Sequence, residues 1–569
     1  MTDDFQVIAQ NADAPFTLRA HRGEGMVLLA MNWSGPEPPV NFVGFAIEYR
    51  EPNDDQWWPL TNRIRFADAD EHDKKLRSSL FSPFQKFRWV HFPLHAELPG
   101  AFTYRVKPVF MDEEEVLSYG EVQQLDVELR RETYPNELNV TFTRGFVSSQ
   151  AFVDHYVKDG PISTLLPRSA DDGLDFVPTH PDAADAYHWM GFEARDAILE
   201  VLDEAVDGSD AHVFVIAYDL NEPEILSRLQ SLGHRLRIII DDSDDHGAAT
   251  SAETKAEELL ALSAGDANVK RQHMGSLQHN KTIVVASSTQ QRVVCGSTNF
   301  SWRGFFVQNN NAVVLTGTRA VDHFRAAFEQ YWASDSVSAF GASASQQRTD
   351  LELLNVDADV AFSPHSQDGA LRDSIAQDIL QTTSSLFYSL AFLYQTEGSI
   401  RDAVTTITED STKFVFGMSD RPIGGIELQT PDANLAPVSP AALGANAPEP
   451  FSSEPAGGSG IRLHHKFVVI DFDQPEARVY LGSYNFSEPA DTSNGENLLL
   501  IRDRRIAVAY MVEAVRIFDH YQFRIKQQDA ENTGDRLVLM KPPTQSGEEP
   551  WWKKDYTEPV RIRDRLLFS

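Results

Sequence analysis

The stretch that decides the fold reads Arg462-Leu-His-His-Lys-Phe-Val-Val-Ile-Asp471, followed by Val479-Tyr-Leu-Gly-Ser-Tyr-Asn-Phe-Ser487 and Asn494-Gly-Glu-Asn497. Its apolar, branched residues from Phe467 to Ile470 predict a buried strand. Because side chains alternate along a strand, His464 and Lys466 share one face and His465 points the other way. An imidazole, an ammonium group, and the hydroxyl and amide of a following turn together suit a tetrahedral anion such as phosphate.

The same pattern occurs earlier in the chain. His279-Asn-Lys281 precedes an apolar run and is followed by Gly296-Ser-Thr-Asn-Phe-Ser301. The spacing from Gly296 to Asn311 equals that from Gly482 to Asn497. One HxK sequence alone is a weak signal, but two copies, each followed by GSxNFS, are a specific one.

Both copies resemble the phospholipase D superfamily, whose signature is HxKxxxxD followed by GSxN. The second copy matches it fully through His464, Lys466 and Asp471, whereas the first has Ala286 where the signature has Asp. The resemblance covers roughly residues 135 to 530. It implies two lobes packed face to face, with both HxK motifs meeting between them.

The order of the predicted elements repeats as well. Strands alternate with helices twice from about Asn139 onward, which predicts mixed sheets flanked by helices and an internal duplication of about 190 residues. We therefore expect an α/β fold of two duplicated phospholipase D-like lobes meeting at one active site, preceded by an all-β sandwich domain. The expected domains are the sandwich (residues 1–132), lobe 1 (133–345), lobe 2 (346–530) and a C-terminal tail (531–569).

Three segments lie outside the motifs. Short strand-like runs punctuated by Gly and Pro predict an immunoglobulin-like or fibronectin-like sandwich before residue 132, and we expect that domain to bind a protein partner or the substrate. An insertion at residues 422–460 has no clear periodicity, so it is either a lid over the site or a disordered loop. Trp551 and Trp552 in the tail are expected to dock back on the body of the protein.

Composition narrows the possible functions. The chain of 569 residues has a net charge of −34, which counts against a protein that simply coats nucleic acid. It has one cysteine, no apolar run long enough to cross a bilayer and no signal-peptide pattern in residues 1–20, so a cytoplasmic protein is expected. However, Ala267 to Val321 contains no acidic residue and includes Arg271, Lys281, Arg292 and Arg303, as an anionic substrate would require.

The resemblance implies a reaction that proceeds through a phosphohistidine. His279 would be the nucleophile and His464 the general acid, with Lys281 and Lys466 neutralising the phosphate oxygens. Glu496 follows the second GSxN and would orient His464 and raise its pKa, which agrees with His464 as the acid. Asn310 occupies the matching place in the first copy. The residues expected to bind substrate are Ser297, Asn299, Ser483, Asn485, Asn310 and Arg303. The reaction requires no metal or other cofactor, and the acidic run Asp241 to His246 is interpreted as a solvated turn.

Three functions fit these features. A nuclease acting on DNA or RNA is favoured by the leaderless chain and the acid-free basic segment. A phospholipase D or phosphatidyltransferase is favoured by the same motifs and the possible lid. A non-catalytic binding protein is suggested by Ala286, although both His/Lys pairs are intact.

Replacing either histidine of the pair tests the two-histidine mechanism. We expect His279→Ala and His464→Ala each to lower turnover by at least about 10²–10⁴-fold, because acid–base or nucleophilic help is lost. His465→Ala should be much milder, since strand alternation turns it away. Near-wild-type turnover in either of the first two variants would contradict the mechanism, and an essential His465 would mean that the strand register is wrong.

Overall fold

The computed structural model describes residues 5–70, 73–129, 132–148, 152, 155–156, 160–167, 169–393, 397–421, 425–439 and 463–569. Its contacts divide the chain into two compact units. Unit 1 comprises Met1–Arg131 and Val508–Ser569, and unit 2 comprises Glu132–Ala507. Both copies of the motif lie in unit 2.

Unit 1 contains the predicted β sandwich. One sheet has the order β1-β2-β3-β6; the other has the order β5-β4-β7-β8, with β9 paired to β7. The strands are β1 (Gln6–Ile8), β2 (Phe16–Arg22), β3 (Val27–Trp33), β4 (Phe42–Arg50), β5 (Trp58–Pro59), β6 (Arg88–His91), β7 (Ala101–Met111), β8 (Leu117–Tyr119) and β9 (Gln123–Glu128). Alternate side chains of β2 and β3, such as Phe16 and Leu29, share one buried core with those of β4 and β7. The sheet-rich N-terminal region is therefore confirmed.

The C-terminal tail packs on this sandwich. Trp552 is part of the same core, and Trp551 donates a hydrogen bond from Nε1 to the carbonyl oxygen of Phe42 at 3.0 Å. The helices of this segment are α13 (Lys554–Thr557) and α14 (Pro559–Phe568), and α12 (Arg504–Thr533) precedes them. The expectation that the tryptophan pair docks on the body is confirmed.

The first half of unit 2 is a seven-stranded mixed sheet with the order β10-β16-β15-β14-β11-β12-β13. Its strands are β10 (Leu138–Phe142), β11 (His212–Ala217), β12 (Leu236–Ile240), β13 (Val269–Arg271), β14 (Lys281–Ala286), β15 (Gln291–Gly296) and β16 (Asn311–Thr316). Its longer helices are α2 (Ala183–Asp207), α3 (Pro223–Leu232), α4 (Ala252–Ala264) and α6 (Thr318–Ala333), and the short α5 (Trp302–Phe306) and α7 (Val337–Gly341) complete this half. Helix α3 ends at Gly233, which has a φ of 57°.

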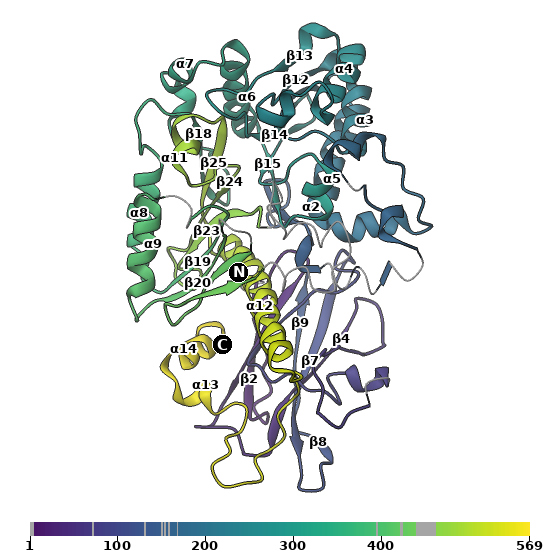
Figure 1. The fold of residues 1–569 in the computed structure, drawn as a ribbon, viewed down its shortest axis with the longest axis vertical. Helices are drawn as coiled ribbons and strands as arrows, with labels where there is room; N and C mark the ends of the chain where they lie inside the picture. Colours follow the sequence, from purple (N-terminus) through teal and green to yellow (C-terminus); the bar gives the residue numbers. More distant parts are fainter. Residues whose placement is uncertain are drawn as a thin grey trace. The chain divides into compact units, whose positions relative to one another are not determined.

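The second half repeats this order in a nine-stranded sheet, β17-β18-β25-β24-β23-β19-β20-β21-β22. Its strands are β17 (Thr349–Asp350), β18 (Asp357–Ser363), β19 (Ser385–Leu390), β20 (Phe414–Asp420), β21 (Ile426–Gln429), β22 (Leu435–Val438), β23 (Lys466–Ile470), β24 (Arg478–Gly482) and β25 (Glu496–Arg502). Helices α8 (Arg372–Leu380) and α9 (Ser399–Glu409) pack on one face of this sheet, and the short α11 (Glu488–Thr492) follows the second GSxN turn. Figure 1 shows β18, β25, β24, β23, β19 and β20 side by side, with α8 and α9 alongside.

The two sheets confirm the predicted mixed α/β fold. In each, the HxK strand is the middle strand of the sheet order and is antiparallel to both of its neighbours, the GSxN strand on one side and β11 or β19 on the other. Strand β14 therefore corresponds to β23, and β11 to β19. The insertion differs in part from the expectation of an irregular loop, because β21 and β22 form a hairpin that extends the sheet from β20. The rest of the predicted insertion, residues 422–424 and 440–460, lies outside the described residues.

Asp471 of the signature lies at the far end of β23 from Lys466 and has a structural function. Its carboxylate accepts hydrogen bonds from the backbone N–H groups of Thr383, Ser384 and Ser385 at 2.7–3.1 Å, and from the hydroxyl of Thr383 at 2.9 Å. These bonds hold the turn that leads into β19. The first copy, which has Ala286 at this position, therefore lacks a contact that holds a turn, and it does not lack a side chain of the site.

Replacing Asp471 tests this function. We expect Asp471→Ala to lower the free energy of unfolding by about 2–4 kcal/mol, because it leaves the backbone N–H groups of Thr383, Ser384 and the buried Ser385 without their acceptor. Thermal and denaturant unfolding measure the loss. Asp432→Ala, in the exposed turn between β21 and β22, is the control and should cost about 1 kcal/mol or less. Equal stability of the two variants would contradict the structural role of Asp471.

Candidate active site

The two HxK motifs are placed alike at the starts of equivalent strands. Lys281 begins β14 and Lys466 begins β23, and both side chains are buried. Each lysine donates a hydrogen bond from Nζ to the carbonyl oxygen of its own histidine, at 2.6 Å to His279 and 2.8 Å to His464. The backbone of each motif is thus fixed by its own ammonium group.

The lobes exchange partners across their boundary. A parallel bridge joins Gln278 to Gly495, and a second one joins Asn309 to Leu463. Each bridge sets a histidine beside a residue of the other lobe. Both oxygens of Glu496 lie 2.9 Å from Nδ1 of His279, and Oδ1 of Asn310 lies 2.7 Å from Nδ1 of His464.

This exchange corrects one expectation from the sequence. Glu496 was expected to orient the histidine of its own copy, His464, and to raise its pKa. It contacts His279 instead, because the residues after GSxN in each lobe reach across to the other lobe. Sequence spacing places Glu496 correctly in its own strand but carries no information about which lobe it faces.

The hydrogen-bond network assigns the tautomers of both histidines. A carboxylate only accepts, so Nδ1 of His279 carries the proton that it donates to Glu496. The Asn310 amide donates to the carbonyl oxygen of Gly304, and its Oδ1 also accepts from the hydroxyl of Ser297. Its oxygen therefore faces His464, whose Nδ1 is the donor. Both histidines are left with Nε2 as the reactive nitrogen.

Burial and positive charge act on both imidazoles. Burial lowers the pKa of His279, the charges of Lys281 and Lys466 lower it further, and Glu496 opposes them. Burial and the same two lysines hold the pKa of His464 well below its usual value. The neutral form is favoured in both. The expectation that a carboxylate raises the pKa of His464 is therefore wrong for the free protein.

The lysines are destabilised as cations by the same surroundings. Burial lowers the pKa of Lys281 to about 8, against the attraction of Glu496 and Asp219. Burial and the charge of Lys281 hold the pKa of Lys466 well below its usual value. Two buried ammonium groups that repel each other form a site that an anion stabilises.

The GSxN turns are rigid. Gly296 and Gly482 have φ values of 130° and 146°, and a Cβ would lie 2.6 Å and 2.3 Å from the carbonyl oxygens of Asn311 and Asn497. The Ser297 hydroxyl accepts from the backbone N–H of Asn311, and the Ser483 hydroxyl accepts from the backbone N–H of Asn497. Both serines, expected to bind substrate, thus hold the turns.

The two GSxN asparagines differ in their surroundings. Asn299 donates from Nδ2 to Asp219 at 2.5 Å. Its Oδ1 and that of Asn485 are buried and find no hydrogen-bond partner among the described residues. Of the predicted substrate ligands, these two side chains retain free polar capacity.

Two arginines of the acid-free segment, Arg271 and Arg292, have partners within the protein. Arg271 donates to the carbonyl oxygens of Asp241 and His246 at 2.9 Å and 2.7 Å and pairs with Glu257. Arg292 lies 3.7 Å from Glu204. Arg303, in α5, is close enough to Asp219 to help lower the pKa of that carboxyl. The acid-free segment therefore supplies internal ion pairs more than a cationic surface.

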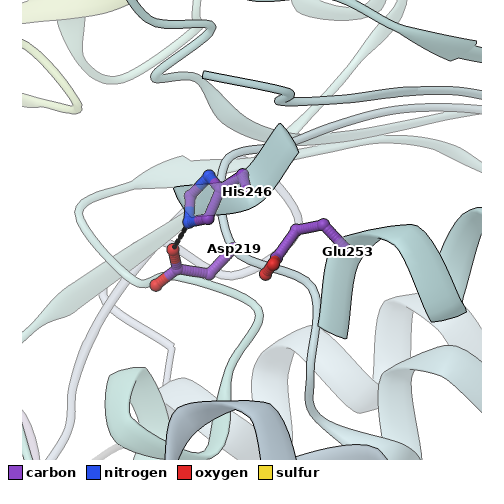
Figure 2. A group of neighbouring side chains, drawn as sticks. All are labelled: Asp219, His246 and Glu253. Carbon is purple, nitrogen blue, oxygen red and sulfur yellow. Dashed lines mark ion pairs between the residues drawn. The ribbon is translucent and has the colours of Figure 1, made fainter. Parts of the chain in front are cut away.

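A histidine between two carboxylates adjoins the site, and sequence reasoning missed it. Nε2 of His246 lies 3.1 Å from Oδ1 of Asp219, and Nδ1 lies 2.9 Å from Oδ2 of Asp241 (Figure 2 draws the pair with Asp219). The Asp241–His246 run is not a solvated turn, because the side chain of Asp241 is fully buried. The strand order could have indicated this pair of carboxylates. Strands β11 and β12 are parallel neighbours, so Asp219 and Asp241, which follow them, lie at one edge of the sheet.

Asp219, His246 and Glu253 are also the described group that could hold a metal ion. One ligand atom from each lies within 4.8 Å of the others. Burial alone would lower the pKa of His246, but the hydrogen bonds that its ring donates to Asp219 and Asp241 raise it to about 10. An imidazolium thus accounts for the charge between these carboxylates.

Comparison with known proteins agrees with this geometry. The family model described as "Cardiolipin synthase, PLD-like domain" matches residues 198–332 and 448–518. Phospholipase D of Rickettsia prowazekii (strain Madrid E) is 42% identical over 48 residues, and that of Rickettsia felis is 40% identical over 48 residues. Each match covers 8% of this chain and 22% of the relative, so the similarity spans about a fifth of those proteins.

Solved structures are similar at a lower level. Phosphatidylserine synthase of Haemophilus influenzae Rd KW20 covers 62% of this chain and 94% of its own, with 14% identity and a TM-score of 0.41. The match to Nuc of Salmonella typhimurium, a phospholipase D family member, covers 24% of this chain and 87% of Nuc, with 25% identity and a TM-score of 0.20.

Two HxK…GSxN copies lie at equivalent strands, with the partners of their histidines exchanged between lobes. The family-model match and the two relatives support the phospholipase D superfamily for this chain.

Replacing the residues that contact Nδ1 of the two histidines, Glu496 and Asn310, tests the exchange of partners between the lobes. We expect Glu496→Gln to lower the pKa of His279, because the carboxylate that stabilises its imidazolium is lost. Asn310→Asp should raise the pKa of His464 by adding a carboxylate at 2.7 Å. Imidazole NMR signals followed over a pH series measure both. A shift of His464 in Glu496→Gln, with His279 unchanged, would contradict the exchange.

Proposed function

We propose that the chain is a phosphodiesterase that works through a phosphohistidine on His279. The observation that carries the proposal is the pairing of two Nε2-reactive histidines with two buried lysines at the boundary between lobes. The structure offers a nucleophile, a second proton carrier and two cations, which is the set that displacement at a phosphodiester needs.

In the first step, the Nε2 lone pair of His279 attacks phosphorus and the bond to the leaving oxygen breaks. The leaving oxygen takes a proton from Nε2 of His464. The N–P bond makes the His279 imidazole cationic, and Glu496 at 2.9 Å stabilises that charge, which supports His279 as the nucleophile.

In the second step, Nε2 of His464 takes a proton from a water molecule whose oxygen attacks phosphorus. The N–P bond breaks and its electron pair returns to His279. The general acid must first be protonated. A phosphodiester anion between the lysines opposes their effect on the pKa of His464, so substrate binding itself prepares the acid.

The groups that carry both steps are side chains of the chain itself, so the proposal requires no metal ion. The non-catalytic alternative rested on Ala286. That position corresponds to Asp471, which holds a turn at the far end of its strand. Its replacement leaves the proposed chemistry intact.

Nucleic acid is the first candidate substrate, supported by Lys281 and Arg303 in the acid-free segment from Ala267 to Val321, and by Lys466 in the second motif. Phospholipid is the second. Two observations favour it: Arg271 and Arg292 are tied to internal partners, and Asp219 adds negative charge beside the site. A polynucleotide gains from many cationic contacts, whereas a lipid head group needs only one phosphate site.

The proposal includes a cytoplasmic location and recognition of a protein partner by the N-terminal sheets. The single buried cysteine, Cys295, is compatible with a reducing compartment. Among the described helices, none has the length and apolar character that crossing a bilayer requires.

A chelator-containing assay tests the activity and its substrate. Plasmid DNA, RNA and phosphatidylcholine vesicles are each incubated with the protein in EDTA, with His279→Ala as the inactive control. We expect cleavage of at least one substrate and trapping of phosphate on His279, seen by mass spectrometry. DNA or RNA cleavage that falls steeply with salt selects the nuclease, and choline release selects the lipid enzyme. Activity that disappears in EDTA, or persists in His279→Ala, contradicts the mechanism.

A further inference from the structure

The Asp219–His246–Asp241 chain lies outside both sequence motifs but reaches the key groups of lobe 1. Asp219 accepts from the Asn299 amide at 2.5 Å. Asp241 accepts from the backbone N–H of Gln278, the residue before His279, at 2.6 Å. His246 joins the two carboxylates through its two ring nitrogens. One imidazole therefore connects the GSxN turn to the segment that carries the nucleophile.

Tyr218 provides a second connection. Its ring centre lies 4.6 Å from that of His246 and 4.7 Å from that of His279. Nζ of Lys281 lies 4.5 Å from the same ring centre. The tyrosine ring thus separates His246 from the HxK motif and contacts both of its functional side chains.

The second lobe is built differently at this place. Ala217 pairs with Lys281 in the first sheet, and Leu390 pairs with Lys466 in the second. Tyr218 and Asp219 therefore correspond to Ala391 and Phe392, so the carboxylate that holds Asn299 has an aromatic residue as its counterpart in the second lobe. The Asp219–His246–Asp241 chain therefore belongs to lobe 1, which carries the proposed nucleophile.

We propose that His246 is a positioning residue of the lobe 1 half-site, which fixes Asn299 through Asp219 and the approach to His279 through Asp241. The inference rests on the proposed function, since it specifies how the phosphate site of that function is held.

The physical reason lies in the amide group. Asn299 has two N–H bonds on Nδ2, and Asp219 accepts one of them. The other is then fixed in direction and available to a phosphate oxygen. The ring of His246, with Nε2 at 3.1 Å from Oδ1 of Asp219 and Nδ1 at 2.9 Å from Oδ2 of Asp241, holds the Asp219 carboxylate in place. Preorganised donors of this kind bind an anion without a cost of reorientation.

A double-mutant cycle on inorganic phosphate binding tests this. We expect His246→Gln to weaken phosphate affinity by about 3- to 10-fold, measured by calorimetry, because the direction of one donor is lost. In an Asn299→Ala background the same change should have less than about a twofold effect, since its route to the phosphate is gone. His273→Gln is the matched control: it is another loop histidine paired with an aspartate, Asp242 at 2.7 Å, and should leave affinity unchanged.

Equal losses from His246→Gln in both backgrounds would overturn the inference, as would a wild-type protein that binds no phosphate. If His246→Gln fails to fold, Asp219→Asn takes its place in the cycle. One divalent ion bound per chain in equilibrium dialysis with Mg²⁺, Ca²⁺ or Zn²⁺, and lost in Glu253→Gln, would make the cluster a metal site and also overturn it. Coupled phosphate binding without cleavage of any phosphodiester would support the inference and end the proposed function instead.

Discussion

The structure of unit 2 depends on the exchange of two buried hydrogen bonds, His279 with Glu496 and His464 with Asn310. Each histidine has its lysine in its own lobe and its Nδ1 partner in the other. Removing one lobe would leave a carboxylate or an amide without its buried partner, at a cost comparable with a lost buried hydrogen bond for each. The lobes are therefore held together by the same contacts that orient the reactive nitrogens. The bridges of Gln278 to Gly495 and Asn309 to Leu463 set the register of that exchange.

The electrostatics follow from this arrangement. Two lysines and two histidines are buried close together, with Glu496 as the carboxylate that contacts a histidine directly. The free site favours neutral imidazoles and an easily deprotonated Lys281, whose pKa of about 8 reflects burial. In the proposed function, a phosphate anion would supply the missing negative charge. Part of the affinity for that anion would then come from balancing the two buried ammonium groups.

Much of the fold could be predicted from the sequence, because repetition is visible in one dimension. The motif copies, the strand and helix order and the docking of Trp551–Trp552 follow from spacing and apolar pattern. Side-chain contacts between the two lobes could not be predicted from the sequence in this way. Glu496 was matched to His464 because the two are close in sequence, and the Asp241–His246 run was interpreted as solvated because acidic runs usually are. Both errors concern side chains whose partners are chosen by packing. Parallel strand order could have placed Asp219 beside Asp241, since both follow neighbouring strands.

The difference between Glu496 in one lobe and Asn310 at the matching position of the other has a consequence for how such a centre arises. In a dimer of identical single lobes, a rotation axis would give both histidines the same partner, two carboxylates or two amides. One histidine paired with a carboxylate, beside a second histidine paired with an amide, cannot be encoded by one repeated gene product. Covalent joining of the halves lifts that symmetry, so each copy is free to diverge: Asp471 against Ala286, and Asp219 against Phe392. Specialisation of the two histidines is thus a property that tandem duplication permits and self-association forbids.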